Sequence, residues 1–368
     1  MKLLFIFGTR PEAIKLAPVI LGAKRDPFFK VKVCITEQHK EMLHQVLKFF
    51  QIKSDYSLNI MRKNQSLFST TSSMIRSLEK VLVEAKPDIV IVQGDTTTVF
   101  AGALSAFYLK IPVAHVEAGL RSYNKFSPFP EEMNRVLVSH IANIHFAPTI
   151  RAKEALQKEG INKNIYVVGN TVIDALFMTL NLIKDKDKEL QQHFYFIDPT
   201  KKLILVTGHR RESFGKPFKD ICSALKKIAL RRDVEIVYPV HLNPNVKKPV
   251  FSILKDIKNV HLIDPIEYPK LIWLIKKSYI VLTDSGGIQE EAPSLGKPVL
   301  VMREVTERIE GIEAGTCKLI GTNYKKIVKE VTHLLDDEIL YGKMANSINP
   351  YGDGKSSKRI LSVLKKLL

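Results

Sequence analysis

Short apolar runs alternate with longer amphipathic stretches along the whole chain. In the first half, runs of strand length lie at residues 3–7, 31–36, 89–93, 113–117, 144–147 and 166–168. Stretches of helix length separate them, at residues 11–24, 38–49, 67–84 and 97–108. Because strands that alternate with helices usually form parallel sheets covered on both faces, the pattern predicts an α/β fold.

The pattern starts again in the second half, with runs at residues 203–207, 235–240, 260–263, 279–283 and 298–302. A charged segment, residues 184–192, precedes them and is typical of a passage between domains. A chain of 368 residues also exceeds the usual size of one hydrophobic core. Residues 3–10 and 203–210 are similar, since each reads as a strand followed by glycine, one residue and arginine.

These observations predict two doubly wound, Rossmann-like domains that face each other across a cleft. The first domain is expected at residues 1–175 and the second at residues 176–354. The last amphipathic stretch, residues 355–368, is expected to cross back onto the first domain. In such sheets ligands bind at the carboxyl ends of the strands.

Three carboxylates of the first domain fall at such ends. Asp95 and Glu117 each follow or end an apolar run, and Glu131 opens a helix after a proline-rich loop. Three converging carboxylates repel one another unless a ligand or a reaction uses them. We therefore interpret them as functional candidates; the alternative is that they cap helices or form salt bridges in loops.

The turn after the first run is a candidate phosphate site. Residues 8–12 read Gly-Thr-Arg-Pro-Glu, so a helix N-terminus that attracts anions follows the first strand. Arg10 and Lys15 are the cations that would hold a phosphate there. A simple strand-to-helix turn remains the alternative.

A second candidate phosphate site lies at residues 284–291. Ser285 can cap a helix, and Gly286 and Gly287 leave backbone N–H groups open to a diphosphate. Glu290 or Glu291 would then bond ribose hydroxyls one turn further on. A plain strand-to-helix turn is again the alternative.

Histidine and arginine side chains gather at two strand ends of the second domain. His209, Arg210 and Arg211 follow one run directly and suit a doubly charged phosphate leaving group. Salt bridges from these arginines to Glu212 are the alternative. His241 follows the next run, where a loop histidine without a ligand is as good an interpretation as a binding residue.

Composition restricts the remaining function classes. The net charge is +18, but the lysines are scattered in pairs with few aromatic neighbours, so a solvated surface is preferred to nucleic-acid binding. No apolar run reaches membrane-spanning length and no signal peptide is evident, so a cytoplasmic protein is expected. The three cysteines lack metal-ligand spacing, and His115 and Glu117 lack a third ligand, so no metal is expected.

Together the motifs resemble those of the non-hydrolysing UDP-N-acetylglucosamine 2-epimerases. The resemblance extends over nearly the whole chain, in the family's order, and rests on residues 8–12, 93–98, 115–121, 128–132, 169–174, 208–212 and 284–291. It implies a fold like that of B-type glycosyltransferases, with the nucleotide on the second domain and the sugar at the interface. It also implies a homodimer that interconverts UDP-GlcNAc and UDP-ManNAc without NAD or another cofactor.

The resemblance also assigns roles to individual residues. It implies four catalytic side chains: Asp95, Glu117, Glu131 and His209. The residues expected to bind the substrate, its nucleotide or its phosphates are Arg10, Lys15, His209, Arg210, His241, Ser285, Gly286, Gly287, Glu291 and Arg308. Some relatives bind a second UDP-GlcNAc as an activator; Gln38 and His39 match that site, whereas Glu37, Lys40 and Asn64 depart from it. Ile309 replaces a proline of the family pattern next to Arg308 and is expected to alter that loop's stiffness.

The chemistry needs this set of groups. The C2 proton of the sugar is adjacent to no carbonyl, so the expected route expels UDP from C1 as C2 loses its proton. A glycal forms, and re-addition of UDP with protonation from the opposite face inverts C2. We assign C2 proton transfer to Asp95 and Glu131, with Glu117 assisting the glycal step. The alternatives are a hydrolysing epimerase that releases free ManNAc, a glycosyltransferase, a nucleotide-sugar-binding module without catalysis, and a polyanion-binding protein.

Overall fold

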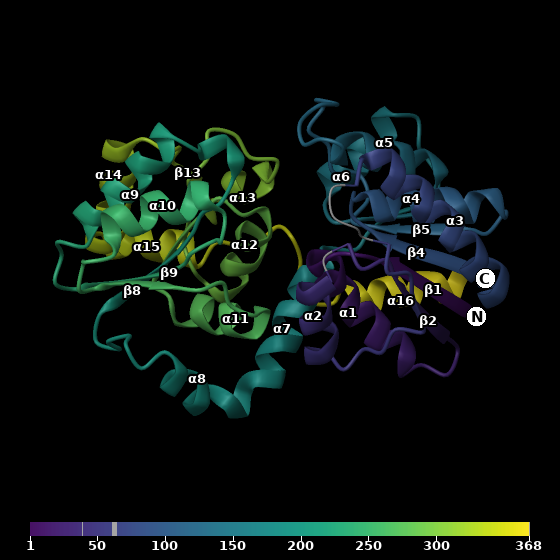
Figure 1. Ribbon diagram of the computed structural model, residues 1–368, viewed down its shortest axis with the longest axis horizontal. Helices are drawn as coiled ribbons and strands as arrows, with labels where there is room; N and C mark the ends of the chain where they lie inside the picture. The colour runs from purple at the N-terminus through teal and green to yellow at the C-terminus, as the bar shows by residue number, and fades with distance from the viewer. Residues whose placement is uncertain (39, 61–64, 368) are drawn as a thin grey trace. The chain divides into compact units, whose positions relative to one another are not determined.

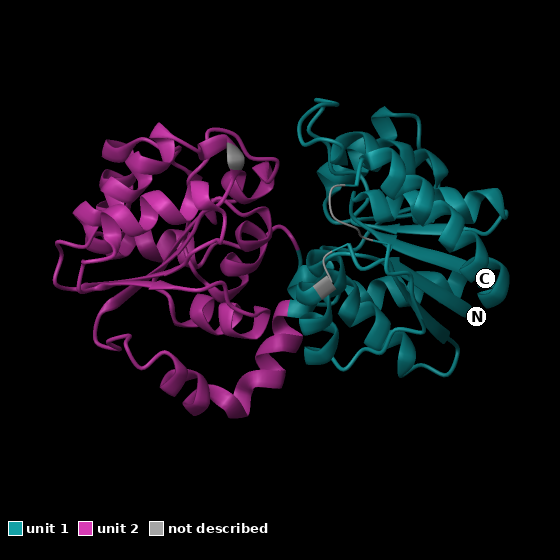
Figure 2. Ribbon diagram, viewed as in Figure 1, with its two compact units in different colours: residues 1–175, 352–368 teal, residues 176–351 magenta. Residues whose placement is uncertain are grey.

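The structure is a computed structural model that describes residues 1–38, 40–60 and 65–367, except the side chains of Lys40 and Arg211. The chain divides into two compact units (Figure 2). Unit 1 comprises Met1–Ala175 and Gly352–Leu368, and unit 2 comprises Leu176–Tyr351.

Unit 1 is built on a parallel sheet, seven-stranded within the described residues. Its strands lie in the order β3 (Tyr56–Ser57), β2 (Lys30–Ile35), β1 (Lys2–Phe7), β4 (Ile89–Gln93), β5 (Val113–Val116), β6 (Ile144–Ala147) and β7 (Ile165–Val167). Its helices are α1 (Arg10–Lys24), α2 (Lys40–Phe49), α3 (Leu67–Ala85), α4 (Thr97–Tyr108), α5 (Glu131–Ile141), α6 (Ile150–Lys158), the start of α7 (Thr171–Ile183) and α16 (Ser356–Leu367). Helices α3, α4 and α5 cover one face of the sheet, and α1 and α16 cover the other (Figure 1).

Unit 2 repeats the plan with a parallel sheet, six-stranded among the residues described. The order is β10 (Val260–Ile263), β9 (Val234–Pro239), β8 (Lys202–Thr207), β11 (Ile280–Thr283), β12 (Val299–Val301) and β13 (Cys317–Leu319). Its helices are η1 (Lys184–Lys186), α8 (Asp187–His193), η2 (Arg211–Ser213), α9 (Lys216–Ile228), α10 (Pro244–Leu254), α11 (Tyr268–Lys277), α12 (Gly286–Glu291), η3 (Ala292–Leu295), α13 (Ile309–Glu313), α14 (Tyr324–Asp336) and α15 (Glu338–Ala345).

The alternating apolar pattern produces these sheets because both of their faces are covered. In unit 1, Leu4 and Ile6 of β1 join the apolar side chains of α3 and α4 in one buried cluster. In unit 2, the inward-facing residues of β8 and β9 pack against α9, α10 and α14. Burial on both faces favours continuous runs of Val, Ile and Leu rather than strict alternation, and those are the runs that the sequence shows.

The charged segment that follows α7 belongs to unit 2. Its residues form η1 and α8, and Trp273 of α11 donates its indole N–H to Asp187 at 2.8 Å. Phe194 stacks on the Trp273 ring with centroids 5.3 Å apart. The division between the units falls inside α7 instead.

The last helix, α16, packs on α1 within unit 1 (Figure 1). Gly22 permits this close approach, because a Cβ there would lie 2.9 Å from Cδ1 of Leu361. The Asp174 carboxylate accepts hydrogen bonds from the backbone N–H of Ser356 at 3.1 Å and of Ser357 at 2.8 Å. These donors are among the first N–H groups of α16, which lack partners within the helix.

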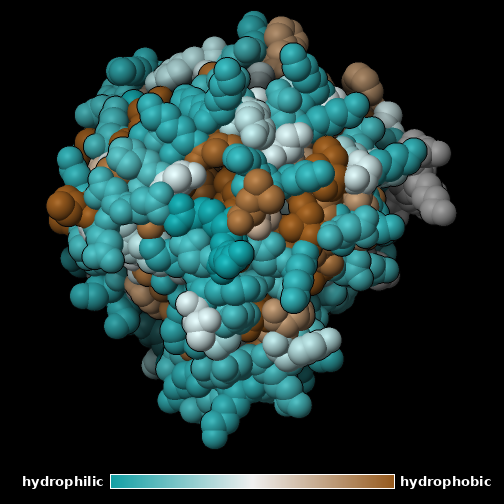
Figure 3. Space-filling view, turned by 90° about the vertical axis from the view of Figure 1, so that its left-hand side faces the viewer, coloured by the Kyte–Doolittle hydropathy of each residue, from teal (hydrophilic) through white to brown (hydrophobic). Residues whose placement is uncertain are grey.

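The surface is mostly hydrophilic on the face shown in Figure 3, where apolar residues form separate patches among polar ones. Within the described ranges, no helix combines the length and the apolar character needed to cross a membrane.

Two histidines are buried side by side in the sheet of unit 1. His115 of β5 and His145 of β6 are Cα partners across the ladder. Burial lowers the pKa of His115 to about 3, with a further contribution from nearby His145, and burial likewise lowers the pKa of His145 to about 4. Both imidazoles are therefore neutral at pH 7, and Nε2 of His115 donates to the carbonyl oxygen of Gly94 at 2.7 Å.

We expect these two histidines to make unit 1 sensitive to acid. Below a pH of about 6.5 the unfolded chain binds protons that the folded chain does not, so the unfolding free energy falls as the pH is lowered towards 4. Each histidine contributes about 1.4 kcal/mol per pH unit in that range. Urea unfolding between pH 7 and pH 4 should therefore show a shallower pH dependence in His115→Gln than in the wild type. The exposed His193→Gln is the control and should match the wild type; equal slopes in all three proteins would contradict the prediction.

Candidate active site

Glu117 lies directly after β5, with its side chain buried. Its backbone has φ of +66°, a left-handed conformation that a non-glycine residue rarely adopts. Nζ of Lys15 lies 2.5 Å from Oε1, and Nδ2 of Asn170 donates to the same oxygen at 2.9 Å. The amide of Gln93 donates to Oε2. A buried carboxylate needs such partners, so one ammonium and two amides hold Glu117 in its ionised form and in one orientation.

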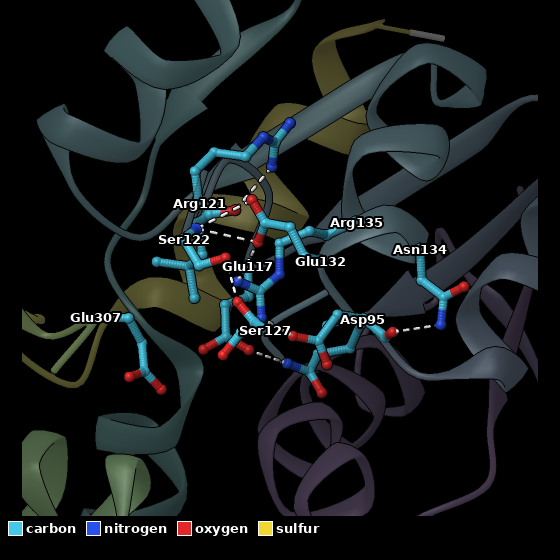
Figure 4. A network of polar contacts seen from close by, with 12 residues as sticks. Asp95, Glu117, Arg121, Ser122, Ser127, Glu132, Asn134, Arg135 and Glu307 are labelled. Atoms are coloured by element: carbon cyan, nitrogen blue, oxygen red, sulfur yellow. Dashed lines mark hydrogen bonds and ion pairs between the residues drawn. The ribbon is translucent and has the colours of Figure 1, made fainter. Parts of the chain in front are cut away.

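Asp95 lies after β4 beside Glu117 (Figure 4). The register pairs Gln93 with Val116, which brings the turns after β4 and β5 together, and a Cβ on Gly94 would lie 3.9 Å from Oε2 of Glu117. The guanidinium of Arg135 bonds Oδ2 of Asp95, and the side chain of Asp95 keeps 29% of its exposure. Asp95 is thus paired on one side and open to solvent on the other.

Glu131 and Glu132 are adjacent in sequence but have different surroundings. Glu132 is buried; it accepts the backbone N–H groups of Ser122 and Tyr123 at 2.9–3.0 Å and pairs with Arg135 at 3.0 Å. Its carboxylate therefore fixes the loop before α5 (Figure 4). Glu131 is half-buried, and the structure records no hydrogen bond or ion pair for its side chain within the residues described.

Helix α5 connects its first turn to Asp95 through Arg135 and Asn134. Glu131 and Arg135 are four residues apart on α5 and so share one face of the helix. Because Arg135 contacts Asp95, that face of α5 is turned towards the end of β4. The amide of Asn134 also donates to the carbonyl oxygen of Asp95, at 2.9 Å. Unit 1 therefore brings Asp95 and Glu117 together at the carboxyl edge of its sheet, and Glu131 lies one turn before Arg135 on α5.

The turn between β1 and α1 is held by a buried carboxylate of its own. Oε2 of Glu12 accepts the N–H groups of Gly8 and Thr9, each at 2.7 Å, and the hydroxyl of Thr96 donates to Oε1. Burial raises the pKa of Glu12, and these hydrogen bonds oppose the rise. Gly8 is required by space, since a Cβ would lie 2.0 Å from Oγ1 of Thr36. Arg10 opens α1 from this turn.

In unit 2, Asp284 organises the turn after β8. Its Oδ2 accepts the backbone N–H groups of His209 at 2.7 Å and Arg210 at 2.8 Å. Oδ1 lies 3.5 Å from Nδ1 of His209. The His209 and His241 rings are stacked with centroids 5.3 Å apart. Burial lowers the pKa of His209, the Asp284 charge counteracts that shift, and His241 and Arg210 reinforce it.

The glycine turn of unit 2 lies beneath an arginine. A Cβ on Gly286 would lie 3.1 Å from Cζ of Arg308, so a side chain there would displace the guanidinium. Nε of Arg308 donates to Glu290 at 2.9 Å and Nη1 donates to Glu307 at 2.7 Å. Burial opposes ionisation of Glu307, but Arg308 and Arg303 lower its pKa to about 2. Arg308 is therefore held by two carboxylates above the start of α12, which Ser285 and Gly287 flank.

The two glutamates expected near a ribose are both buried. Glu290 pairs with Arg308, and Oε1 of Glu291 accepts the hydroxyl of Tyr268 at 2.6 Å. Both have contacts within unit 2, so either would bind a ligand only with an oxygen that those contacts leave accessible.

Of the two residues that match the activator site of some relatives, Gln38 lies among the described residues. The carbonyl of Gln38 accepts the Thr98 hydroxyl at 3.3 Å, beside Gly8 in unit 1. His39 and Asn64 lie outside the described residues. Among the residues described, no three His, Cys, Asp or Glu side chains are grouped so that they could hold a metal ion.

Sequence reasoning assigned no role to several polar residues that the structure places in these clusters. They are Gln93, Asn170, Glu132, Arg135 and Asp284. All lie in or beside the motifs of the resemblance, which was the available signal. Lys15, expected at a phosphate, is placed against Glu117.

Over nearly its whole length, the sequence matches proteins of a single family. The family model for UDP-N-acetylglucosamine 2-epimerase matches residues 22–365. The UDP-N-acetylglucosamine 2-epimerase of Escherichia coli (strain K12) is 55% identical over 370 residues, which cover 99% of this chain and 98% of that protein. The chain belongs to the UDP-N-acetylglucosamine 2-epimerase family.

Solved structures of this family have the same fold. The UDP-GlcNAc 2-epimerase from Neisseria meningitidis, bound to UDP-GlcNAc, has a TM-score of 0.95 at 52% identity, with both chains covered completely. The UDP-GlcNAc 2-epimerase from Methanocaldococcus jannaschii, in complex with UDP-GlcNAc and UDP, has a TM-score of 0.85 at 39% identity, again with complete coverage of both. The resemblance in the motifs and the prediction of two Rossmann-like, parallel-sheet α/β domains are confirmed.

We expect the adjacent glutamates of this epimerase-family chain to differ in their effect on stability. Glu132→Gln removes a buried charge that compensates Arg135 and weakens the acceptor for two backbone N–H groups, so the unfolding free energy should fall by about 2–4 kcal/mol. Glu131→Gln, the matched control one residue away, should change it by less than about 0.5 kcal/mol. Urea unfolding at pH 7 measures both. Equal effects of the two substitutions would contradict the roles given to these side chains.

Proposed function

We propose that this chain is a non-hydrolysing UDP-N-acetylglucosamine 2-epimerase, which interconverts UDP-GlcNAc and UDP-ManNAc. The main support is the pair of carboxylates of unit 1 that lie after neighbouring strands, Asp95 and Glu117, with a third, Glu131, at the start of α5, one helical turn before the arginine that pairs with Asp95. A reaction that removes a proton from one face of a sugar and returns it to the other needs more than one acid–base group. Family membership supports the same activity.

The reaction proceeds by elimination and re-addition. A base removes the C2 proton, the bond from C1 to the UDP oxygen breaks, and a glycal and UDP result. An acid then protonates C2 from the opposite face, and the C1–oxygen bond forms again. Neither step oxidises or reduces the sugar overall, so the route needs no NAD.

The settings of the three carboxylates suit different roles. Asp95 is partly exposed and Glu131 is half-buried, so both can exchange a proton with a bound sugar. We assign C2 proton transfer to these two residues. Glu117 is held by Lys15 and two amides, which suits a fixed negative charge that stabilises positive charge at C1 as UDP departs.

We assign binding of UDP to unit 2. The backbone turn at His209 and Arg210, fixed by Asp284, and the guanidinium of Arg308 offer donors and positive charge for a diphosphate. We place the remaining nucleotide contacts at Ser285, Gly286, Gly287, Glu291 and His241. Phosphate binding by Arg10 and Lys15 of unit 1 stays a prediction, since Lys15 is paired with Glu117. His209 has a lowered pKa and so is neutral at pH 7, which allows it to accept or donate a proton as UDP leaves and returns.

Three further expectations stay predictions. These are a homodimer, a cytoplasmic location, and activation by a second UDP-GlcNAc through Gln38 and His39. The first follows from the resemblance alone. The last is opposed by the departures at Glu37 and Lys40.

The purified chain incubated with UDP-GlcNAc in heavy water should yield UDP-ManNAc with deuterium at C2, followed by NMR. Asp95→Asn and Glu131→Gln should each lower turnover by about 10²–10⁴-fold, because each removes one proton-transfer group. Glu154→Gln, an exposed position on α6, serves as the control and should keep wild-type turnover.

Other products would support the alternatives. Free ManNAc and UDP would indicate a hydrolysing epimerase, and UDP binding without turnover would indicate a binding module. Wild-type turnover in both carboxylate variants would contradict our assignment of the C2 base and acid.

A further inference from the structure

Two amide side chains determine how Glu117 is presented. Gln93 ends β4 and Asn170 precedes α7, so the two donors come from different parts of unit 1. Each is only 2% exposed. Lys15 on α1 is a third donor, so Glu117 receives hydrogen bonds from three separate parts of unit 1.

The orientation of the Asn170 amide is fixed by two different partners. Its Oδ1 accepts the backbone N–H of Val172 at 3.0 Å, which makes Asn170 the cap of α7. Its Nδ2 donates to Oε1 of Glu117 at 2.9 Å. Turning the amide over would bring two donors together at Val172 and two acceptors together at Glu117. The α7 cap therefore holds the amide so that it donates to Glu117.

We propose that Asn170 and Gln93 are positioning residues for the reaction, because their amides hold the Glu117 carboxylate in one orientation and in its ionised form. The inference rests on the proposed function and adds to it two residues that contact Glu117 rather than the substrate. Asn170 is the more informative, because capping of α7 and donation to Glu117 can be separated by substitution.

Asn170→Asp separates these two roles. Aspartate caps helices as well as asparagine does, so the start of α7 keeps its acceptor. At Glu117, however, a second carboxylate replaces a donor, and like charges repel. A proton shared by the pair restores a donor, so activity lost at high pH should return as the pH falls.

Asn170→Ser also keeps the cap of α7, but it removes the donor to Glu117 without adding a charge. Serine also caps helices but carries no amide that reaches Glu117. The ionised carboxylate loses one donor without gaining a charge, so Glu117 takes up a proton more readily and activity should be lost at low pH.

Other charged groups near Glu117 do not explain such opposite responses. Lys15 on α1 pairs with Glu117, Asp95 after β4 pairs with Arg135, and none of the substitutions removes a member of either pair. Asp174 on α7 accepts from the start of α16. His115 on β5, with its pKa lowered by burial to about 3, stays neutral across the range tested.

The test is a kcat and KM profile with UDP-GlcNAc between pH 5.5 and pH 8.5. At pH 8, kcat of Asn170→Asp should fall by about 10²-fold with KM changed less than threefold. The ratio of its kcat to the wild-type value should rise as the pH falls, whereas that ratio for Asn170→Ser should decline. Gln93→Glu, which places a carboxylate at the second donor, should behave like Asn170→Asp.

Asp174→Asn is the control on the same helix. It weakens the attachment of α16, so it should lower the melting temperature and leave the shape of the pH profile unchanged. Variants at Asn170 and Gln93 with kcat within twofold of the wild type and flat ratios would overturn the proposal. A wild-type protein that makes no UDP-ManNAc would instead overturn the proposed function, so the two failures are distinguishable.

Discussion

In both units, buried carboxylates need hydrogen-bond donors, and this requirement determines which polar groups surround them. An isolated ionised carboxylate is very costly to bury, and each one therefore determines which groups surround it. Glu117 gathers an ammonium and two amides, and Glu132 gathers a guanidinium and two backbone N–H groups. Because these carboxylates stand at or beside the carboxyl ends of parallel strands, the sheet brings their donors to one edge. The arrangement of charges follows from the topology.

In each unit, a buried carboxylate holds the turn after the first strand, but that carboxylate comes from a different element in each. The sequences after β1 and β8 are alike, and in each turn two consecutive backbone N–H groups bind a buried carboxylate. In unit 1 that carboxylate is Glu12, which the following helix provides. In unit 2 it is Asp284, which comes from the end of the neighbouring strand β11. Measured from the shared glycine, the donors in unit 2 lie one residue later than those in unit 1, and the carboxylate comes from a different element.

The fold was predictable because the pattern of apolar residues is local. Runs such as those of β1, β4 and β8 are long and apolar, so they were found from sequence. The strand β3 spans only Tyr56–Ser57 at a sheet edge, and two residues are too few to show the hydrophobic pattern of a strand. The segment after α7 resembled a linker because it is charged, yet Trp273 and Phe194 fix part of it to unit 2.

The candidate site was predictable only in part. The positions of Asp95 and Glu117 after neighbouring strands could be predicted, because the ends of parallel strands converge, whereas the role of Glu131 stays a prediction. The donors could not, since the pairing of Gln93 and Asn170 with Glu117 depends on strand register and on residues 53 positions apart in the chain. Nor does sequence separate Glu131 from Glu132, because their difference lies in the loop that Glu132 binds.

The chain leaves and re-enters unit 1 at one place. Asn170 and Asp174 lie where α7 departs, Asp174 binds the start of α16, and a Cβ on Gly352 would lie 3.4 Å from the nitrogen of Asn170. The first turn of α7 is thus held by residues near the end of the chain. During synthesis on a ribosome, this part of unit 1 must wait for unit 2 to be translated before its last helix is available. A nascent chain that stops short of α16 therefore lacks the acceptor–donor contacts that steady α7, although every carboxylate of the cluster has already been made.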